Sequence, residues 1–195
     1  MTETAIKSEP RLKFKFDNYI KPIIPYISGN HLDIGCGYGE ITSYLSLLNR
    51  NSRVVGFDID NQKIAVAKLF TRQNLKFTDS RKDLDKEFSS ASGIFVFHEA
   101  FETLFLTASK ALISHQSMFS IVDYHIKGLN QDDFVKIFSS PYETKELAEL
   151  GIEAAFCLHT RYNLSDCINL SRKYGFKTIS SQIIDNKYFI WTGQN

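Results

Sequence analysis

The chain has 195 residues, which is enough for one domain with a buried core. Its 23 basic and 22 acidic residues give a net charge of +1, so it lacks the basic excess of duplex nucleic-acid enzymes. Its three cysteines, Cys36, Cys157 and Cys167, are too few and too scattered for a disulfide framework or a zinc site. No apolar run reaches the roughly 18 residues of a membrane span, and no secretory signal is recognisable. We therefore expect a cytoplasmic protein without a membrane anchor.

The first predicted element is a lead-in helix over residues 11–28, kinked or broken by Pro22 and Pro25. From His31 onward, strands and helices are predicted to alternate. The pattern predicts strands at 31–34, 53–57, 75–78, 93–97 and 118–122. It predicts helices that begin near Glu40 and Asn61, a short polar helix over 81–88, and a longer helix over 101–113.

Residues 127–163 do not follow this alternation. They are predicted to hold helices at 131–138 and 143–158, and to form a substrate lid, a structural cover or a dimer contact. A helix over 166–174, ended by Gly175, and strands over 177–184 and 187–191 should complete the chain. The whole pattern predicts a single α/β domain over 1–195. Its doubly wound, mostly parallel sheet should have helices on both faces and an antiparallel C-terminal edge.

The most informative motif lies between the first strand and its helix, in His31-Leu-Asp-Ile-Gly-Cys-Gly-Tyr-Gly-Glu40. Glycines in such a turn allow a nucleotide-like ligand to approach the backbone closely. The spacing does not match the dinucleotide fingerprint G-x-G-x-x-G, because the third glycine would fall on Glu40 or Thr42. A phosphate loop with Gly-Lys-Ser/Thr is absent from the sequence.

Two acids follow the next two predicted strands. Asp58 ends the second strand, 21 residues after Gly37, where nucleotide-binding α/β folds place a carboxylate that binds a ribose diol. Asp79 ends the third strand. Either acid also fits a simpler role at the N-terminus of the following helix.

The D-x-G-x-G-x-G pattern with these two acids resembles motif I and the following strands of class I S-adenosylmethionine-dependent methyltransferases. The resemblance covers nearly the whole chain from residue 11. It implies a Rossmann-like sheet of order 3-2-1-4-5-7-6 and S-adenosylmethionine as cofactor. It also implies the residues of the donor site: Asp33, Gly35, Gly37 and Gly39 beside the methionine part, Asp58 at the ribose, Asp79 and Ser80 at the adenine, and His98 beside the transferable methyl group. Ile59, next to Asp58, is a further candidate residue of that site.

Three histidines are candidates for the acceptor side. His98 follows the predicted fourth strand, His125 follows the fifth, and His159 ends the predicted insertion. A base is needed where the acceptor must lose a proton, and histidine is the commonest one. We rank His98 first, His125 second and His159 third. Ordinary structural roles and a metal site with neighbouring carboxylates are the alternatives. The ligand spacing is not diagnostic of a metal, and we assign none.

These features predict methyl transfer from S-adenosylmethionine to a small-molecule acceptor. The insertion at 127–163 would then resemble the substrate lids of small-molecule methyltransferases. The Asn/Asp-Pro-Pro-aromatic tetrapeptide of enzymes that methylate nucleic-acid bases is missing after the fourth strand. One alternative is RNA methylation through a basic N-terminal segment, which makes nucleic acid an unlikely but open partner. That segment comprises Lys7, Arg11, Lys13, Lys15 and Lys21. The other alternative is a protein that binds the donor without turnover.

Overall fold

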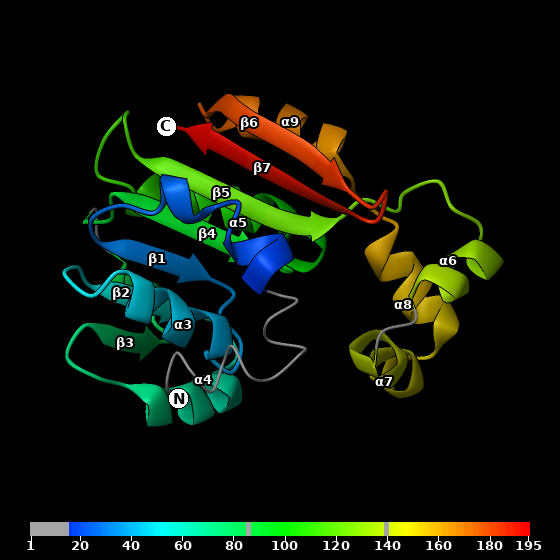
Figure 1. Ribbon diagram of the computed structural model, residues 1–195, viewed down its shortest axis with the longest axis horizontal. Coiled ribbons are helices and arrows are strands. Elements are labelled where there is room, and N and C mark those ends of the chain that lie inside the picture. The colour runs from blue at the N-terminus through cyan, green and yellow to red at the C-terminus, as the bar shows by residue number, and fades with distance from the viewer. Residues whose placement is uncertain (1–15, 85–86, 139–140) are drawn as a thin grey trace.

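A seven-stranded sheet forms the centre of the computed structural model, which describes residues 16–84, 87–138 and 141–195 (Figure 1). The strands are β1 (His31–Ile34), β2 (Val54–Phe57), β3 (Leu75–Thr78), β4 (Ser90–Ile94), β5 (Met118–Tyr124), β6 (Lys177–Ile184) and β7 (Tyr188–Gln194). Their order is β3-β2-β1-β4-β5-β7-β6. The first five strands are parallel, and β7 runs antiparallel to β5 and β6. The predicted fold class, strand order and antiparallel edge are therefore confirmed.

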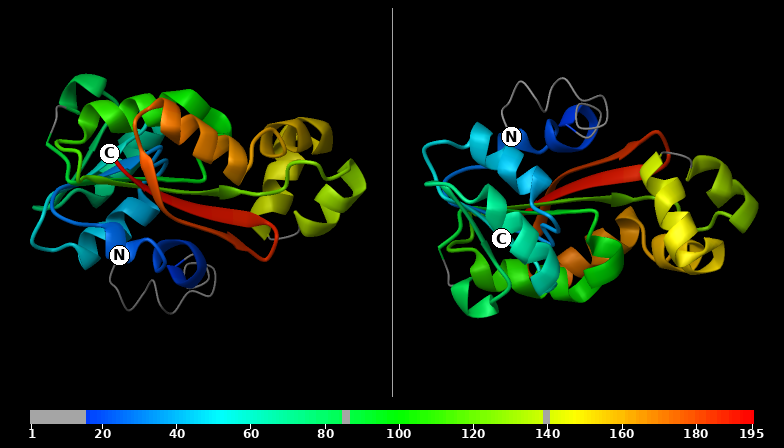
Figure 2. Two further views of the ribbon diagram at one scale, coloured as in Figure 1. Left: turned by 90° about the horizontal axis from the view of Figure 1, so that it is seen from above. Right: turned by 90° about the horizontal axis from the view of Figure 1, so that it is seen from below.

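Helices cover both faces of this sheet. The helical elements of the described residues are η1 (Phe16–Ile20), η2 (Ile24–Tyr26), α3 (Glu40–Leu48), α4 (Asn61–Ala67), η3 (Lys68–Phe70), η4 (Arg81–Asp83), α5 (Phe97–Ala111), α6 (Gln131–Ile137), α7 (Pro141–Leu150), α8 (Ile152–His159) and α9 (Leu164–Lys173). In Figure 2, α5 and α9 lie on one face, while η1, η2 and α3 lie on the other. Every residue of β1, β2 and β4 is buried, as expected of parallel strands covered on both sides.

The helices α6, α7 and α8 form a lobe beyond the end of β5, to the right of the sheet in Figure 1. This lobe occupies the predicted insertion between β5 and α9. It lies at the carboxyl ends of the central strands, where open α/β sheets bind their ligands. The lobe is therefore placed to contribute to a site at that edge of the sheet.

The fourth strand and its helix differ from the sequence-based prediction. The strand was expected at 93–97 and is found at Ser90–Ile94, so His98 does not follow it directly. The apolar run continues past the strand, but Phe95 has a φ of +56° and leaves extended geometry. The helix begins at Phe97 instead of Phe101, which remains inside it as a kink with a φ of +25°. His98 therefore lies in the first turn of α5.

Other boundaries also differ. The expected helix over 143–158 is two helices, because Gly151 has a φ of +83° and separates α7 from α8. Of the expected helix over 81–88, only the short turn η4 forms, and residues 85–86 lie outside the described residues. The lead-in segment is the π-helical turn η1 and the 3₁₀ turn η2, separated near Pro22 as expected. Its residues 11–15 lie outside the described residues.

Candidate functional site

The glycine loop after β1 is open on one side. Gly35, Gly37 and Gly39 all have positive φ values, of 74°, 53° and 80°. A Cβ on Gly35 would meet Val96 at 2.4 Å, and one on Gly39 would meet Phe77 at 2.7 Å. A Cβ on Gly37 would have no atom within 4 Å. The outer glycines are therefore required by close packing, whereas the middle one faces free space where a ligand has room to approach.

Asp58 joins this loop to the end of β2. Its Oδ2 accepts the backbone N–H of Gly37 at 2.8 Å, and its Oδ1 accepts the N–H of Asp60 at 2.9 Å. The carboxylate is only partly buried, so it retains acceptor capacity toward a ligand. The next side chain, Ile59, is 77% exposed. An acid and an apolar side chain thus lie together beside the open loop.

Asp33 lies beneath the loop and not at its surface. It is 2% exposed, and its carboxylate accepts hydrogen bonds from Thr42 Oγ1 at 2.6 Å and Ser92 Oγ at 2.9 Å. Burial raises the pKa of Asp33 to about 6, against the lowering effect of these two hydroxyls. Ser92 Oγ also contacts Nε2 of the buried His31 at 3.1 Å. Asp33 therefore holds α3 and β4 against β1, which fixes the loop from below.

The end of β3 exposes Asp79. Its neighbour Ser80 caps η4, since Ser80 Oγ accepts the N–H of Lys82 at 3.3 Å. The backbone N–H of Ser80 donates to Thr78 Oγ1 at 3.0 Å, so the turn itself uses this group. Of these two predicted adenine-site residues, Asp79 is the one whose side chain is exposed to solvent.

The segment after β4 is held by a buried acid from β5. Asp123 is 1% exposed, and its Oδ2 accepts the backbone N–H groups of Phe97 at 2.6 Å and His98 at 3.2 Å. Its Oδ1 accepts the N–H of Tyr124 at 2.7 Å. The carboxylate therefore satisfies the first turn of α5, where helix N–H groups lack partners within the helix. This contact sets the start of α5.

His98 pairs with the same carboxylate. Its Nδ1 lies 2.7 Å from Asp123 Oδ1, and the residue is 4% exposed. Burial acts to lower the pKa of His98, but the charge and hydrogen bond of Asp123 outweigh it and raise the pKa. Because a carboxylate accepts and does not donate, Nδ1 carries a proton, and Nε2 of the neutral ring can act as a base. Nε2 lies 3.7 Å from Oε1 of the exposed Glu99, whose charge also raises the pKa of His98.

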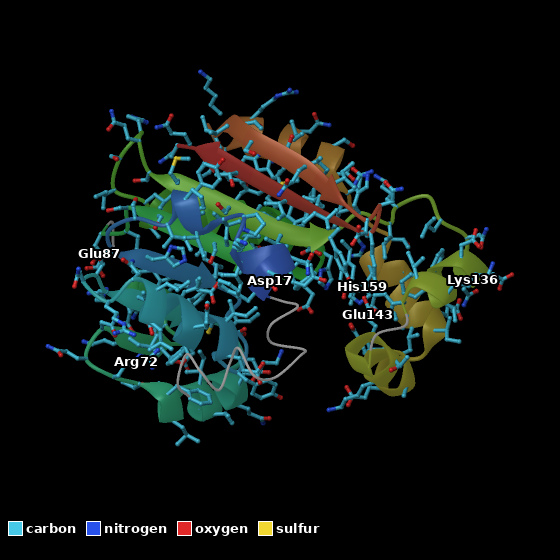
Figure 3. All side chains as sticks on the ribbon, viewed as in Figure 1. Asp17, Arg72, Glu87, Lys136, Glu143 and His159 are labelled. Atoms are coloured by element: carbon cyan, nitrogen blue, oxygen red, sulfur yellow. The ribbon has the colours of Figure 1, made fainter. Side chains whose placement is uncertain are left out.

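His159 reaches the same place from the end of α8. Its ring centroid is 4.5 Å from that of His98 and 4.6 Å from that of Tyr124. Its Nε2 lies 2.8 Å from Glu146 Oε1 of α7. Figure 3 shows His159 and Glu143 on the side of the lobe that faces the sheet, whereas Lys136 points away from it. Two of the three predicted histidines are thus brought together.

His125 lies elsewhere. Its Nδ1 accepts the backbone N–H of Leu164, the first residue of α9, at 3.4 Å. Partial burial lowers its pKa. His125 therefore supports the start of α9, and the contacts that link His98 with His159 do not include it.

Asp123, Tyr124 and Glu146 were not among the predicted site residues, and Asp123 was considered only as one ligand of an alternative metal site. The position of Asp123 in the sequence could have indicated a role in the site, because it lies directly at the end of an apolar strand and two residues before His125. The position of Glu146 could not, since it is one of several acids on a polar helix. Of the predicted basic segment, only Lys21 belongs to the part of the chain that the structure describes.

Within the described ranges, histidine, cysteine and carboxylate side chains do not gather in groups of three that could hold a metal ion. The described helices are too short or too polar to cross a bilayer.

Comparisons of the sequence with known proteins agree with this geometry. A family model described as a methyltransferase domain matches residues 28–86, which contain the glycine loop, Asp58 and Asp79. A candidate methyltransferase of Invertebrate iridescent virus 6, 235L, is 35% identical over 66 residues. That match covers 33% of this chain and 25% of the viral protein, so the chain matches about a quarter of the length of this curated relative.

Solved structures resemble nearly the whole chain. The PH0226 protein of Pyrococcus horikoshii OT3 has a TM-score of 0.66 at 17% identity, covering 97% of this chain and 92% of its own. An S-adenosylmethionine-dependent methyltransferase from Aquifex aeolicus has a TM-score of 0.65 at 14% identity, covering 99% and 98%. The plantazolicin methyltransferase BpumL, solved with S-adenosylhomocysteine, has a TM-score of 0.59 at 18% identity, covering 98% and 93%. At such identities the likeness shows the fold. The family model adds that residues 28–86 are similar to a methyltransferase domain.

Proposed function

We propose that the protein transfers a methyl group from S-adenosylmethionine to a small-molecule acceptor, with His98 as the base. The observation that carries this proposal is the free space beside Gly37, next to the partly exposed Asp58 carboxylate. In this proposal the glycine loop holds the methionine part of the donor, and Asp58 accepts hydrogen bonds from the ribose hydroxyls. Ile59 and Asp79 border the adenine, the first by apolar contact and the second as an acceptor for its amino group.

The chemistry is an in-line displacement. The donor supplies an electrophilic methyl carbon on a sulfonium, so the S–C bond breaks, its electron pair stays on sulfur, and the new bond forms to the acceptor. The protein's main contribution is to position the two reactants and exclude water. An acceptor hydroxyl or ammonium must also lose a proton. His98 Nε2 takes this proton, and Asp123 stabilises the resulting imidazolium before the proton passes to water.

The Asp123–His98 pair favours a catalyst over a protein that only binds the donor. A buried carboxylate already occupied by three backbone N–H groups does not need an imidazole for its own satisfaction. The pair instead orients the ring and gives Nε2 the properties of a general base. The enclosing lobe favours a small acceptor, and BpumL, a structural neighbour, is named for a plantazolicin.

Turnover tests this proposal. Protein incubated with S-adenosylmethionine and a metabolite extract should form S-adenosylhomocysteine. Replacing His98 with Ala should cut the rate by about 10²–10⁴-fold, while S-adenosylhomocysteine affinity stays near normal. The matched control is His115→Ala, since His115 is exposed and remote from the site in the chain. Full activity in the His98 variant would overturn the assigned base. Donor binding without any product would instead support a non-catalytic binding protein.

A further inference from the structure

One nitrogen of His159 is buried without a partner. The side chain is 2% exposed, and Nδ1 has no hydrogen-bond partner in the part of the chain that the structure describes. Leaving a buried polar atom unpaired destabilises the folded state, and such atoms are uncommon in native proteins. The unpaired Nδ1 therefore indicates that a ligand pairs with this nitrogen.

The protonation of the ring follows from its other nitrogen. Nε2 lies 2.8 Å from Glu146 Oε1, and an ionised carboxylate only accepts hydrogen bonds. In the neutral ring the proton therefore lies on Nε2, and Nδ1 presents a lone pair. The group without a partner is thus an acceptor, which matches a ligand that donates an O–H or N–H.

His98 presents a second lone pair nearby. Asp123 fixes a proton on Nδ1, so in the neutral ring Nε2 is the hydrogen-bond acceptor, and Glu99 Oε1 lies 3.7 Å from it. The two rings come from separate elements, the start of α5 and the end of α8, and their centroids are 4.5 Å apart. Two acceptor nitrogens, each with its ring oriented by a carboxylate, therefore lie in one small region.

The surroundings of His159 are aromatic. Its ring centroid is 4.6 Å from that of Tyr124 and 4.9 Å from that of Phe138. Packing alone does not explain the residue, because a phenylalanine would fill the same space without an unpaired nitrogen. Anchoring α8 to α7 through Glu146 explains Nε2 but leaves Nδ1 without a role.

We infer that His159 binds the substrate that accepts the methyl group. We further infer that this substrate is a small aromatic molecule with two adjacent hydrogen-bond donors, such as a vicinal diol or an amino-alcohol. This inference rests on the proposed function. One donor binds His159 Nδ1, and the other loses its proton to His98 Nε2 as it is methylated. Both rings are nearly enclosed, so the substrate reaches them when the lobe of α6 to α8 moves away from the strand ends.

Two substitutions separate the nitrogens of His159. Gln has its terminal amide near the Nε2 position, so His159→Gln keeps a donor for Glu146 and loses the Nδ1 lone pair. Asn has its side-chain oxygen near the Nδ1 position, so His159→Asn keeps an acceptor and loses the contact with Glu146. If His159 binds the substrate through Nδ1, the Gln variant should lose its preference for a ligand with two adjacent donors. If His159 only anchors α8 to α7, the Asn variant should lose that preference instead.

Calorimetric titration of the protein loaded with S-adenosylhomocysteine measures the difference. Catechol is the probe with two adjacent donors and phenol the probe with one, both with a chelator present to exclude metal effects. We expect the wild type and His159→Asn to bind catechol at least about tenfold more tightly than phenol, because one additional buried hydrogen bond is worth about that factor. In His159→Gln this preference should disappear.

Equal catechol preference in the wild type and His159→Gln would overturn the inference, as would loss of that preference in the Asn variant alone. Failure of the loaded protein to bind either probe would overturn it too. These outcomes are distinct from failure of the proposed function. Loading with S-adenosylhomocysteine is measured first, and its absence would contradict the donor site itself.

Discussion

Asp58 is the residue on which the proposed donor site depends most. Its carboxylate links the N–H of Gly37 to the end of β2. Replacing it with Ala should weaken S-adenosylhomocysteine binding by about 1–3 kcal/mol, because the ribose hydroxyls lose a charged acceptor. Asp58→Asn is the matched control, since it keeps an oxygen for the Gly37 N–H and should lose less affinity. Calorimetry measures both, and unchanged affinity in the Ala variant would contradict the assigned role.

The glycines of the loop should respond differently to the same change. Gly39→Ala places a Cβ 2.7 Å from Phe77 at a φ of +80°, so the free energy of unfolding should fall by about 2–4 kcal/mol. Gly37→Ala meets no neighbour and should cost about 1–2 kcal/mol for its positive φ alone. Its methyl group would instead obstruct the donor. Urea denaturation should therefore show the larger loss of stability in Gly39→Ala. Titration with S-adenosylhomocysteine should show the larger loss of affinity in Gly37→Ala.

His31 and Asp33 should give compensating pH effects on stability. Burial lowers the pKa of His31 to about 3 and raises that of Asp33 to about 6. As the pH falls from about 6 toward 3.8, the ordinary pKa of Asp, the folded protein gains a proton on Asp33. Over the same range the unfolded chain gains one on His31, whose ordinary pKa is 6.5. Equal proton uptake leaves stability unchanged.

Asp33→Asn should reveal the pH dependence of stability that His31 causes, because the compensating carboxyl group is gone. The folded variant gains no proton in this range, whereas the unfolded variant still does. Its stability should therefore fall relative to the wild type as the pH drops below 6.5, by about 1 kcal/mol per pH unit. Urea denaturation near pH 6.5 and about two units lower measures the difference. Parallel pH curves for the two proteins would show that Asp33 does not hold the compensating proton.

Among the elements, a buried ion pair between Glu143 and Lys187 connects α7 to the start of β7. Glu143 accepts hydrogen bonds from Lys187 Nζ at 2.8 Å and Tyr188 Oη at 3.0 Å, and it is 3% exposed. Glu143→Ala should lower the free energy of unfolding by about 3–5 kcal/mol, because it leaves a largely buried lysine charge unpaired. Lys136→Ala removes an exposed pair with Asp133, which solvent screens, so it should change the free energy of unfolding far less. A similar cost for both would show that the lobe is not fastened at Glu143.

The elements also show how far the sequence could predict the structure. The strand at 31–34 and the glycine loop are local patterns, so their place was predictable. The end of β4 was not, because Ile94-Phe95-Val96-Phe97 is one apolar run. Its end depends on Asp123, 26 residues away, which binds the N–H of Phe97. The pairing of His159 with Glu146 likewise depends on the break at Gly151, which no periodicity reveals. The strand order came from the family resemblance alone.

In the whole molecule, the two halves of the proposed site lie next to each other along one edge of the sheet. The proposed donor half lies at the ends of β1, β2 and β3, and the acceptor half lies at the ends of β4 and β5. The order β2-β1-β4-β5 places these halves side by side at the point where the chain reverses direction across the sheet, which is where such folds bind ligands. The lobe of α6 to α8 lies beyond that edge (Figure 1).

This edge of the sheet is proposed to bind S-adenosylmethionine and not a dinucleotide. Calorimetric titration of the purified protein with S-adenosylmethionine, and separately with NAD, tests it most directly. The glycine spacing and the free space beside Gly37 predict that S-adenosylmethionine binds to one site per chain and that NAD gives no binding heat. Tight binding of NAD without binding of S-adenosylmethionine would contradict the account.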